Sequence, residues 1–243
     1  MSIKTYNKVD LTLAFNNFSY TIYSHVKNRF KYTHMGGFKR ETCIVYGKEY
    51  CENSEVELIS DVVDGRVIDA SLSSNGKFLI ILSVFAGGRT STLYIYSMPD
   101  YKNKGKAGIP RPTLTDTIIL KSVLLYSKID IADDGSRIFI SEPYRVNDET
   151  TKVSGSLGGV HVYNHDVVMN NWNRGQFIRP PVPLDSAKLF GTDIFYDNCN
   201  KTLNILVSNE PSDLTYCFKE TDLHGEEKFK TKWSFNSFID SNL

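Results

Sequence analysis

The feature that most constrains this chain is an internal repeat, because a fixed period of several tens of residues decides an architecture before any single motif does. Segment 11–24 aligns without a gap to segment 70–83, at an offset of 59 residues. A third copy, with its turn at Asp133-Asp134-Gly135, keeps that offset, and a fourth spans 193–208 with one or two extra residues expected in its turn. Each copy reads as two apolar runs around a turn, which is the pattern of a β-hairpin. Asn-Gly and Asp-Gly at these turns predict a two-residue turn.

Two further strand candidates follow each hairpin. The first set ends in an aromatic residue in each repeat and covers 43–46, 93–96, 160–163 and 214–218. The second, weaker set covers 56–62, 113–123, 176–182 and 228–239. No segment longer than about ten residues has a helical period, and proline and glycine interrupt the connections. The sequence therefore predicts an all-β fold of four tandem, four-stranded antiparallel units of about 60 residues.

Four-stranded meanders in tandem are typical of the blades of a β-propeller. We expect a single β-propeller-like domain over 1–243, with repeats at approximately 10–62, 68–123, 127–183 and 188–239. Residues 3–9 are expected to add the outer strand of the last blade. Two alternatives stay open at this point: a β-sandwich with accidental periodicity, and half of a larger ring that a second chain completes.

Residues 126–143, followed by 158–163 and Trp172, resemble an FG-GAP repeat of integrin-type propellers, and Phe190-Gly191 opens the fourth repeat in the same style. The second repeat, with 72–78 and 93–97, is similar to WD-type blades. The FG-GAP resemblance implies a calcium loop of the form D-x-D-x-D-G. The loops at 133–135 and 197–200 lack that alternation of oxygen ligands, so no calcium site is expected.

Charge and composition exclude several classes of partner. Lysine plus arginine and aspartate plus glutamate each count 28, so no net field favours nucleic acid or an anionic membrane. We find no signal-peptide pattern and no apolar stretch of transmembrane length, and expect a soluble chain. No C-x-x-C pair occurs among Cys43, Cys51, Cys199 and Cys217. Free thiols are expected, with a Cys43–Cys51 bridge as the alternative.

Few residues suggest chemistry. His161 and His165 are four positions apart, which on a strand is about 13 Å and too far for one zinc ion. Asp69, Asp130 and Asp193 recur near the start of the first strand of three repeats. They could line a channel as a ring of acids, or they could make structural hydrogen bonds between neighbouring blades. The sequence has no G-x-S-x-G elbow, no phosphate-binding glycine loop and no dinucleotide fingerprint, so we expect no cofactor, no metal and no enzymatic activity, with a hydrolase as the least favoured alternative.

Two loops predict a partner surface. Segments 27–34 and 142–157 join the second and third strands of their repeats, so both should lie on one rim of a propeller. Their arginine and aromatic residues are of the types that dominate protein interfaces. The expected anchors are Arg29, Phe30, Tyr32, Tyr144 and Arg145.

The sequence therefore predicts a non-enzymatic scaffold that presents loops to protein partners. The expected form is a homo-oligomer or a larger assembly, such as a phage or viral particle. Exposed aromatic residues beside polar loops also stack on sugar rings, so a carbohydrate-binding propeller is the alternative.

Overall fold

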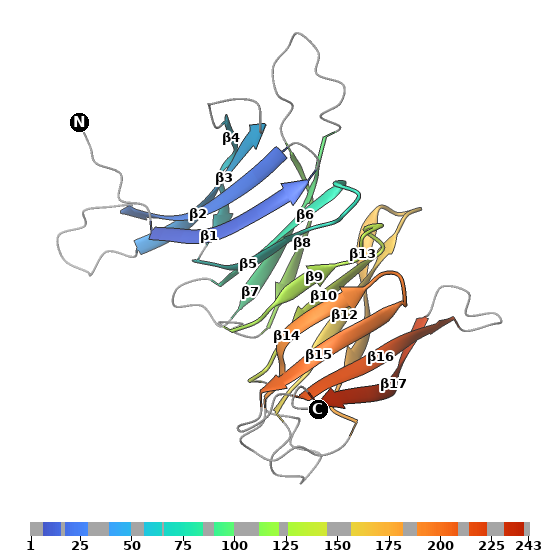
Figure 1. The fold of residues 1–243 in the computed structure, drawn as a ribbon. Helices are drawn as coiled ribbons and strands as arrows, with labels where there is room; N and C mark the ends of the chain where they lie inside the picture. The colour runs from blue at the N-terminus through green and yellow to red at the C-terminus, as the bar shows by residue number, and fades with distance from the viewer. Residues whose placement is uncertain are drawn as a thin grey trace. The chain divides into compact units, whose positions relative to one another are not determined.

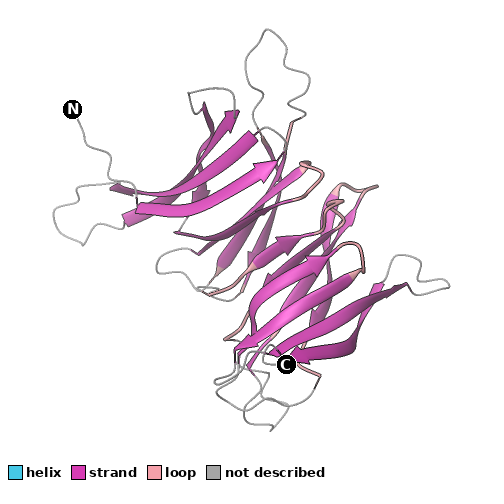
Figure 2. Ribbon diagram, viewed as in Figure 1, coloured by secondary structure: helices cyan, strands magenta, loops and turns pink. Residues whose placement is uncertain are grey.

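A computed structural model of the chain shows strands joined by turns (Figure 2). It describes residues 7–15, 18–28, 39–49, 56–64, 66–84, 90–99, 112–121, 126–144, 157–181, 189–208, 214–222 and 231–240. The chain divides into two compact units, Met1–Leu125 and Tyr126–Leu243. The expectation of one domain stays a prediction. In these ranges, no helix is long and apolar enough to cross a membrane.

The first unit contains two antiparallel sheets whose strands follow one another in chain order. One consists of β1 (Asn7–Phe15), β2 (Phe18–Asn28), β3 (Lys39–Glu49) and β4 (Val56–Asp64). The other consists of β5 (Arg66–Leu72), β6 (Phe78–Val84), β7 (Ser91–Ser97) and β8 (Thr113–Leu120). The prediction that 3–9 joins the last repeat was wrong for the part described, because β1 begins at Asn7 and pairs with β2. Closing a short loop to the next strand costs less chain entropy than pairing with a distant one.

The second unit contains the third and fourth sheets, labelled in Figure 1. The third sheet consists of β9 (Ile129–Ile131), β10 (Arg137–Ser141), β12 (Val160–Asp166) and β13 (Asn171–Ile178). The fourth consists of β14 (Leu189–Asp197), β15 (Thr202–Ser208), β16 (Leu214–Asp222) and β17 (Thr231–Asp240). A two-residue strand that the sequence did not predict, β11 (Leu157–Gly158), pairs in parallel with β14.

The four hairpins share one register. Each contains a cross-strand pair whose members are seven positions apart: Leu13 with Tyr20, Leu72 with Leu79, Ile131 with Ile138, and Tyr196 with Leu203. The first three pairs repeat at the predicted offset of 59 residues. The fourth pair has the same spacing, so the expectation of extra residues in its turn was wrong.

The turns of the second and third hairpins differ in type from the prediction. Gly76 donates its N–H to the Ser73 carbonyl at 2.7 Å, and Gly135 donates to the Ala132 carbonyl at 2.8 Å. Only the glycine of each turn has positive φ, 68° at Gly76 and 73° at Gly135. A two-residue type I′ turn needs positive φ at both central residues. These are longer turns in which the glycine alone supplies the left-handed residue.

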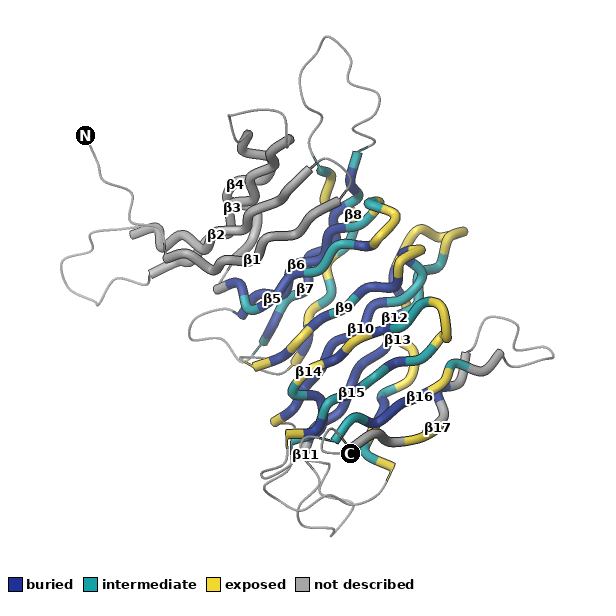
Figure 3. Tube along the Cα trace, in the orientation of Figure 1, coloured by how far each residue is buried: buried dark blue, intermediate teal, exposed yellow. Residues whose placement is uncertain are grey.

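The core of the second unit lies where the third sheet packs on the fourth (Figure 3). Phe139 of β10 is fully buried and contacts the rings of Tyr196 at 4.9 Å and Trp233 at 5.5 Å. Val160 and Val162 of β12 belong to the same buried cluster. Alternate residues of each strand face this cluster, as the period of two in a strand requires.

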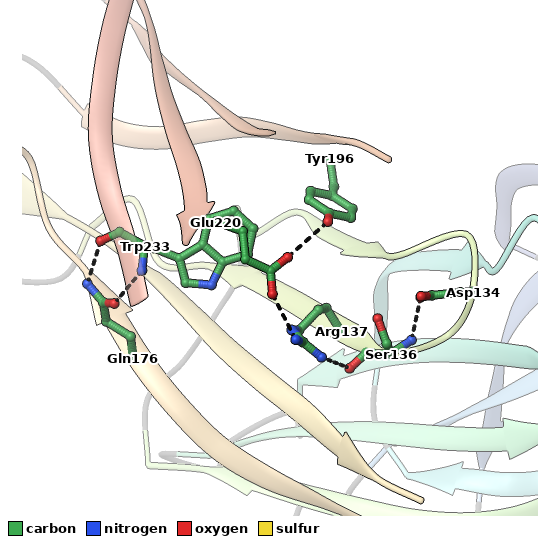
Figure 4. Close-up of polar contacts among 7 residues, drawn as sticks. All are labelled: Asp134, Ser136, Arg137, Gln176, Tyr196, Glu220 and Trp233. Carbon is green, nitrogen blue, oxygen red and sulfur yellow. Dashed lines mark hydrogen bonds and ion pairs between the residues drawn. The ribbon is translucent and has the colours of Figure 1, made fainter. Parts of the chain in front are cut away.

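Polar contacts also join the two sheets (Figure 4). The Arg137 guanidinium lies 2.8 Å from the carboxylate of Glu220 on β16, which also accepts a hydrogen bond from the Tyr196 hydroxyl at 3.2 Å. Gln176 of β13 bonds both backbone groups of Trp233 on β17: its carbonyl accepts from the N–H at 2.9 Å and its amide donates to the carbonyl at 3.2 Å. The third sheet is therefore held against the fourth by specific contacts as well as by apolar packing.

Candidate functional site

A pair of exposed tyrosines marks one end of the third sheet. Beyond the last β9–β10 pair, Ser141 donates its N–H to the Lys128 carbonyl at 2.9 Å, and Lys128 donates its N–H to the Ser141 hydroxyl at 2.8 Å. This continued ladder brings Tyr126 and Tyr144 together, with ring centroids 5.1 Å apart. Tyr126 is 67% exposed and Tyr144 is 55% exposed. We call these two residues the tyrosine pair.

A buried hydrogen-bonded pair, Glu142 and His161, lies close to Tyr144 in the chain. The carboxylate of Glu142 is 2.9 Å from Nε2 of His161 on β12, and both side chains are buried. The His161 ring also packs against Phe177 of β13, with ring centroids 4.5 Å apart and the planes tilted by 47°. A carboxylate oxygen can only accept, so Nε2 of His161 is the donor to Glu142, and Nδ1 has no hydrogen-bond partner among the described residues.

The Glu142–His161 contact closes the base of the connection between β10 and β12. Glu142 also donates its backbone N–H to the Gly159 carbonyl at 2.8 Å. The side chain of Phe177 fills the space beside Gly159, where an added Cβ would lie only 2.1 Å from the ring. Both ends of the connection are thus fixed to the sheet, which gives Tyr144 a rigid base.

The other end of the third sheet carries an exposed apolar turn. Residues 167–170 join β12 to β13, and the three apolar side chains Val167, Val168 and Met169 are 81%, 91% and 69% exposed. Oδ1 of Asp166 accepts the backbone N–H of Val168 and of Met169, both at 3.0 Å. We call residues 167–169 the hairpin tip; its exposure is visible in Figure 3.

Side-chain contacts support the base of the hairpin tip. Trp172 stacks on His165 with ring centroids 4.8 Å apart, and His165 Nε2 lies 3.3 Å from Oδ1 of Asn170. Asn170 has a φ of 50°, a left-handed conformation that asparagine tolerates better than most residues. His161 and His165 therefore have separate polar partners, and no group of three metal-binding side chains occurs among the described residues.

The three aspartates considered as a channel ring do not occupy equivalent positions. Asp69 pairs with Leu82 and Asp193 with Leu206 at one register position, whereas Asp130 pairs with Phe139 at another. Asp130 uses Oδ2 to accept the backbone N–H of Tyr196 on the fourth sheet at 2.8 Å. For Asp130 the structural interpretation, a hydrogen bond between neighbouring sheets, is confirmed.

The predicted partner surface is only partly within the described residues. Tyr144 is exposed and lies at the root of its loop, as expected. Arg29, Phe30, Tyr32 and Arg145 lie outside the described residues, and their role stays a prediction. Sequence reasoning missed Tyr126 and the hairpin tip. The signal for the tip was an apolar triplet between Asp166 and Asn170-Asn171, where a turn is expected to be polar.

The cysteines are described in part. Cys199 is exposed and free, and Cys217 is buried and free, with its thiol 3.1 Å from Oδ1 of Asn204. Cys51 lies outside the described residues, so the question of a Cys43–Cys51 bridge stays open.

The successive antiparallel sheets give the chain a β-propeller-like fold, and solved structures support this. The chain is similar to a complex of KlAtg21 with the coiled-coil of AgAtg16, with a TM-score of 0.53 and 11% identity over 94% of this chain and 56% of that one. It is also similar to a prolyl endopeptidase, with a TM-score of 0.51 and 12% identity over 95% of this chain and 30% of that one.

These likenesses concern the fold alone, because the identities are low. The chain spans about half of the first structure and less than a third of the second. No protein-family model matches the chain, and no curated protein matches it. The FG-GAP or WD type of the repeats and their closure as four blades therefore stay predictions.

Proposed function

We propose that this protein is a non-enzymatic interaction scaffold that binds a protein partner through the end of the third sheet where Tyr126 and Tyr144 lie. The observation that carries the proposal is the tyrosine pair. Tyrosine offers a large contact area at a low cost in side-chain entropy, and it is enriched among the residues that dominate binding energy. Two of them in contact, each more than half exposed, form a surface that gains most when another molecule covers it.

The rigid base under Tyr144 supports this proposal. The Glu142–His161 contact and the Glu142–Gly159 backbone bond fix the start and the end of the loop that Tyr144 opens. A pre-organised anchor loses less conformational entropy on binding than a mobile one. The partner we propose is another copy of the chain or a different protein of a larger assembly, such as a phage or viral particle.

The test uses Tyr126→Ala, Tyr144→Ala and the double variant, measured by light scattering for assembly and by circular dichroism for folding. We expect each single change to weaken association by about 1 to 4 kcal/mol while the chain stays folded. Phe195→Ala on β14 is the control, because Phe195 is also exposed but belongs neither to the tyrosine pair nor to the hairpin tip. Assembly that is equally strong in the double variant would remove the tyrosine pair from the interface.

A carbohydrate ligand is the second candidate, because the same tyrosine pair favours it. The two ring planes are tilted by 54°, an arrangement in which both rings can pack against the apolar face of a sugar. A glycan array probed with the wild type and the Tyr126→Ala/Tyr144→Ala variant separates the two functions. Signals that disappear in the double variant, together with unchanged assembly, would support the carbohydrate function instead of the protein-binding one.

A further inference from the structure

We propose that the hairpin tip, Val167 to Met169, is a second docking element that inserts into an apolar pocket with a basic rim on a partner protein. It lies on the turn between β12 and β13, at the opposite end of β12 and β10 from the tyrosine pair. The proposal is independent of the function proposed above, because it rests on different residues and a different end of the sheet.

The exposure of the tip is the first argument. Isolated apolar residues on a protein surface are common, but three consecutive ones on the same turn are unusual in a soluble protein unless they bind something. The neighbouring positions at this end are polar: Asp133, Asp134 and Ser136 in the β9–β10 turn, and Asn171 and Asn173 on β13. The tip is therefore a local apolar feature and not part of a generally apolar edge.

The rigidity of the tip is the second argument. Asp166 caps two of its backbone N–H groups, and the stacked His165–Trp172 pair supports its base. His165 also donates its backbone N–H to the Ser136 carbonyl at 3.0 Å, which ties the tip to the β9–β10 turn. A turn whose backbone is already fixed by such contacts loses less conformational entropy on binding than a mobile one.

The shape of the tip limits what can cover it. Stable contacts between flat protein surfaces bury on the order of 800 Å² on each side, contributed by 20 or more residues. Three side chains on a four-residue turn provide far less than this against a flat surface. They are buried efficiently only when a concave pocket surrounds them, so the partner must supply the pocket.

Charge at this end of the sheets specifies the rim of that pocket. Four carboxylates lie at this end: Asp133 and Asp134 in the β9–β10 turn, and Asp166 and Asp197 as the last residues of β12 and β14. Asp133 donates its backbone N–H to Oδ1 of Asn198 at 2.9 Å, which brings the turns of the third and fourth sheets together. Over the same turns and the strand residues that flank them, 132–137, 166–171 and 197–202, the cations are Lys201 and Arg137, and Arg137 is paired with Glu220.

Local contacts favour the charged form of two of these carboxylates. Hydrogen bonds from the side chain and backbone of Asn200 lower the pKa of Asp197. Burial opposes ionisation of Asp134, but hydrogen bonds from Ser136 and the charges of Lys201 and Arg137 outweigh it, so the pKa of Asp134 is also lowered. The partner's rim should therefore carry lysine or arginine, and an anionic lipid surface would be repelled.

The experiment probes an array of purified proteins with labelled wild type and with the Val168→Ser/Met169→Ser variant, at low and at high salt. The proposal expects array proteins that bind the wild type at least about tenfold more strongly than the variant. Their binding should weaken as salt rises and in the Asp133→Asn/Asp134→Asn variant. Ile119→Ser is the matched control, because Ile119 on β8 is 68% exposed, and it should leave these signals unchanged.

Two further measurements identify other occupants of the tip. Sedimentation velocity over a range of concentrations tests a second copy of the chain, and flotation with phosphatidylcholine vesicles, with and without phosphatidylserine, tests a membrane. Association that depends on Val168 and Met169 in either measurement would overturn the proposal. An array without any signal that depends on the tip would overturn it as well.

Discussion

Glu142 and His161 form a hydrogen-bonded pair, 2.9 Å apart and buried at the base of the longest connection in the third sheet. Glu142→Gln keeps an oxygen that can accept the Nε2–H of His161, whereas Glu142→Ala leaves this buried N–H without an acceptor. A buried donor that loses its partner costs about 1 to 3 kcal/mol. We expect Glu142→Ala to lower the free energy of unfolding by that amount, and Glu142→Gln by less, in urea titrations. Equal losses would show that the pair acts through charge and not through the hydrogen bond.

The contact between Arg137 and Glu220 should stabilise the packing of the third sheet on the fourth. Both side chains are mostly buried, so Arg137→Met leaves a carboxylate without its cation and should cost about 2 to 4 kcal/mol. Adding Glu220→Leu should recover at least about 1 kcal/mol of that loss, because the unpaired charge is then removed. The four members of this double-mutant cycle are compared by urea denaturation. Strictly additive losses would show that the two residues act separately.

Tyr196 predicts how stability changes at high pH. Burial, together with the charge of Glu220 and the hydrogen bond to it, raises the pKa of Tyr196 above its usual value. The unfolded chain ionises this phenol at about pH 10, while the folded chain keeps it neutral to higher pH. The stabilisation of the folded state that comes from the raised pKa of Tyr196 is therefore complete below about pH 10. It falls as the pH rises from there towards the raised pKa.

Urea titrations between pH 8 and pH 11 check this expectation. Tyr196→Phe should lose less stability than the wild type above pH 10, although some loss remains because burial also raises the pKa of Tyr163 and Tyr216. A Tyr196→Phe curve parallel to that of the wild type would contradict the prediction.

Gly158 occupies a position where no other residue fits. Its φ is 104°, and an added Cβ would lie 2.1 Å from the carbonyl oxygen of Phe190. Because the clash is with backbone, Gly158→Ala should cost about 2 kcal/mol or more. Gly175→Ala is the milder comparison, because its Cβ would lie 2.8 Å from the movable amide of Asn164 and 3.1 Å from the Val162 carbonyl oxygen, and it should cost clearly less than Gly158→Ala. Thermal denaturation of the two variants tests the difference.

Much of the secondary structure could be predicted from the residue pattern. Apolar alternation around a turn located all four hairpins, because the period of two and the turn residues are local properties of the sequence. The type of turn was not predictable from Asn75-Gly76 alone, since the same dipeptide fits turns of different length. The strand β11 was missed because two residues are too few to show any period.

Closure of the sheets into a ring could not be predicted from the repeats, because equivalent positions differ in chemistry. Counted from the shared hairpin register, Phe139 and Val162 of the third sheet correspond to Asn204 and Cys217 of the fourth. The first pair is apolar and buried against the fourth sheet, whereas the second pair makes a polar contact of its own at 3.1 Å. A repeat in backbone register therefore does not imply a repeated packing surface.

In the candidate sites, too, only features with a local signal in the sequence could be predicted. Tyr144 was predicted because aromatic residues in a loop between strands stand out in the sequence. Tyr126 became visible only with the register, which continues past β9 and brings it beside Tyr144. The Glu142–His161 pair joins residues 19 positions apart, and no local pattern connects them.

The parallel pairing of β11 with β14 has a consequence for the way this unit opens. Leu157 and Gly158 belong to the chain that leads into β12, yet their ladder partners are Leu189 and Phe190. The third sheet therefore cannot separate from the fourth without breaking the main-chain hydrogen bonds between β11 and β14. Amide hydrogens of β10, β12 and β15 should thus exchange with deuterium through one shared opening event, as members of a single cooperative folding unit.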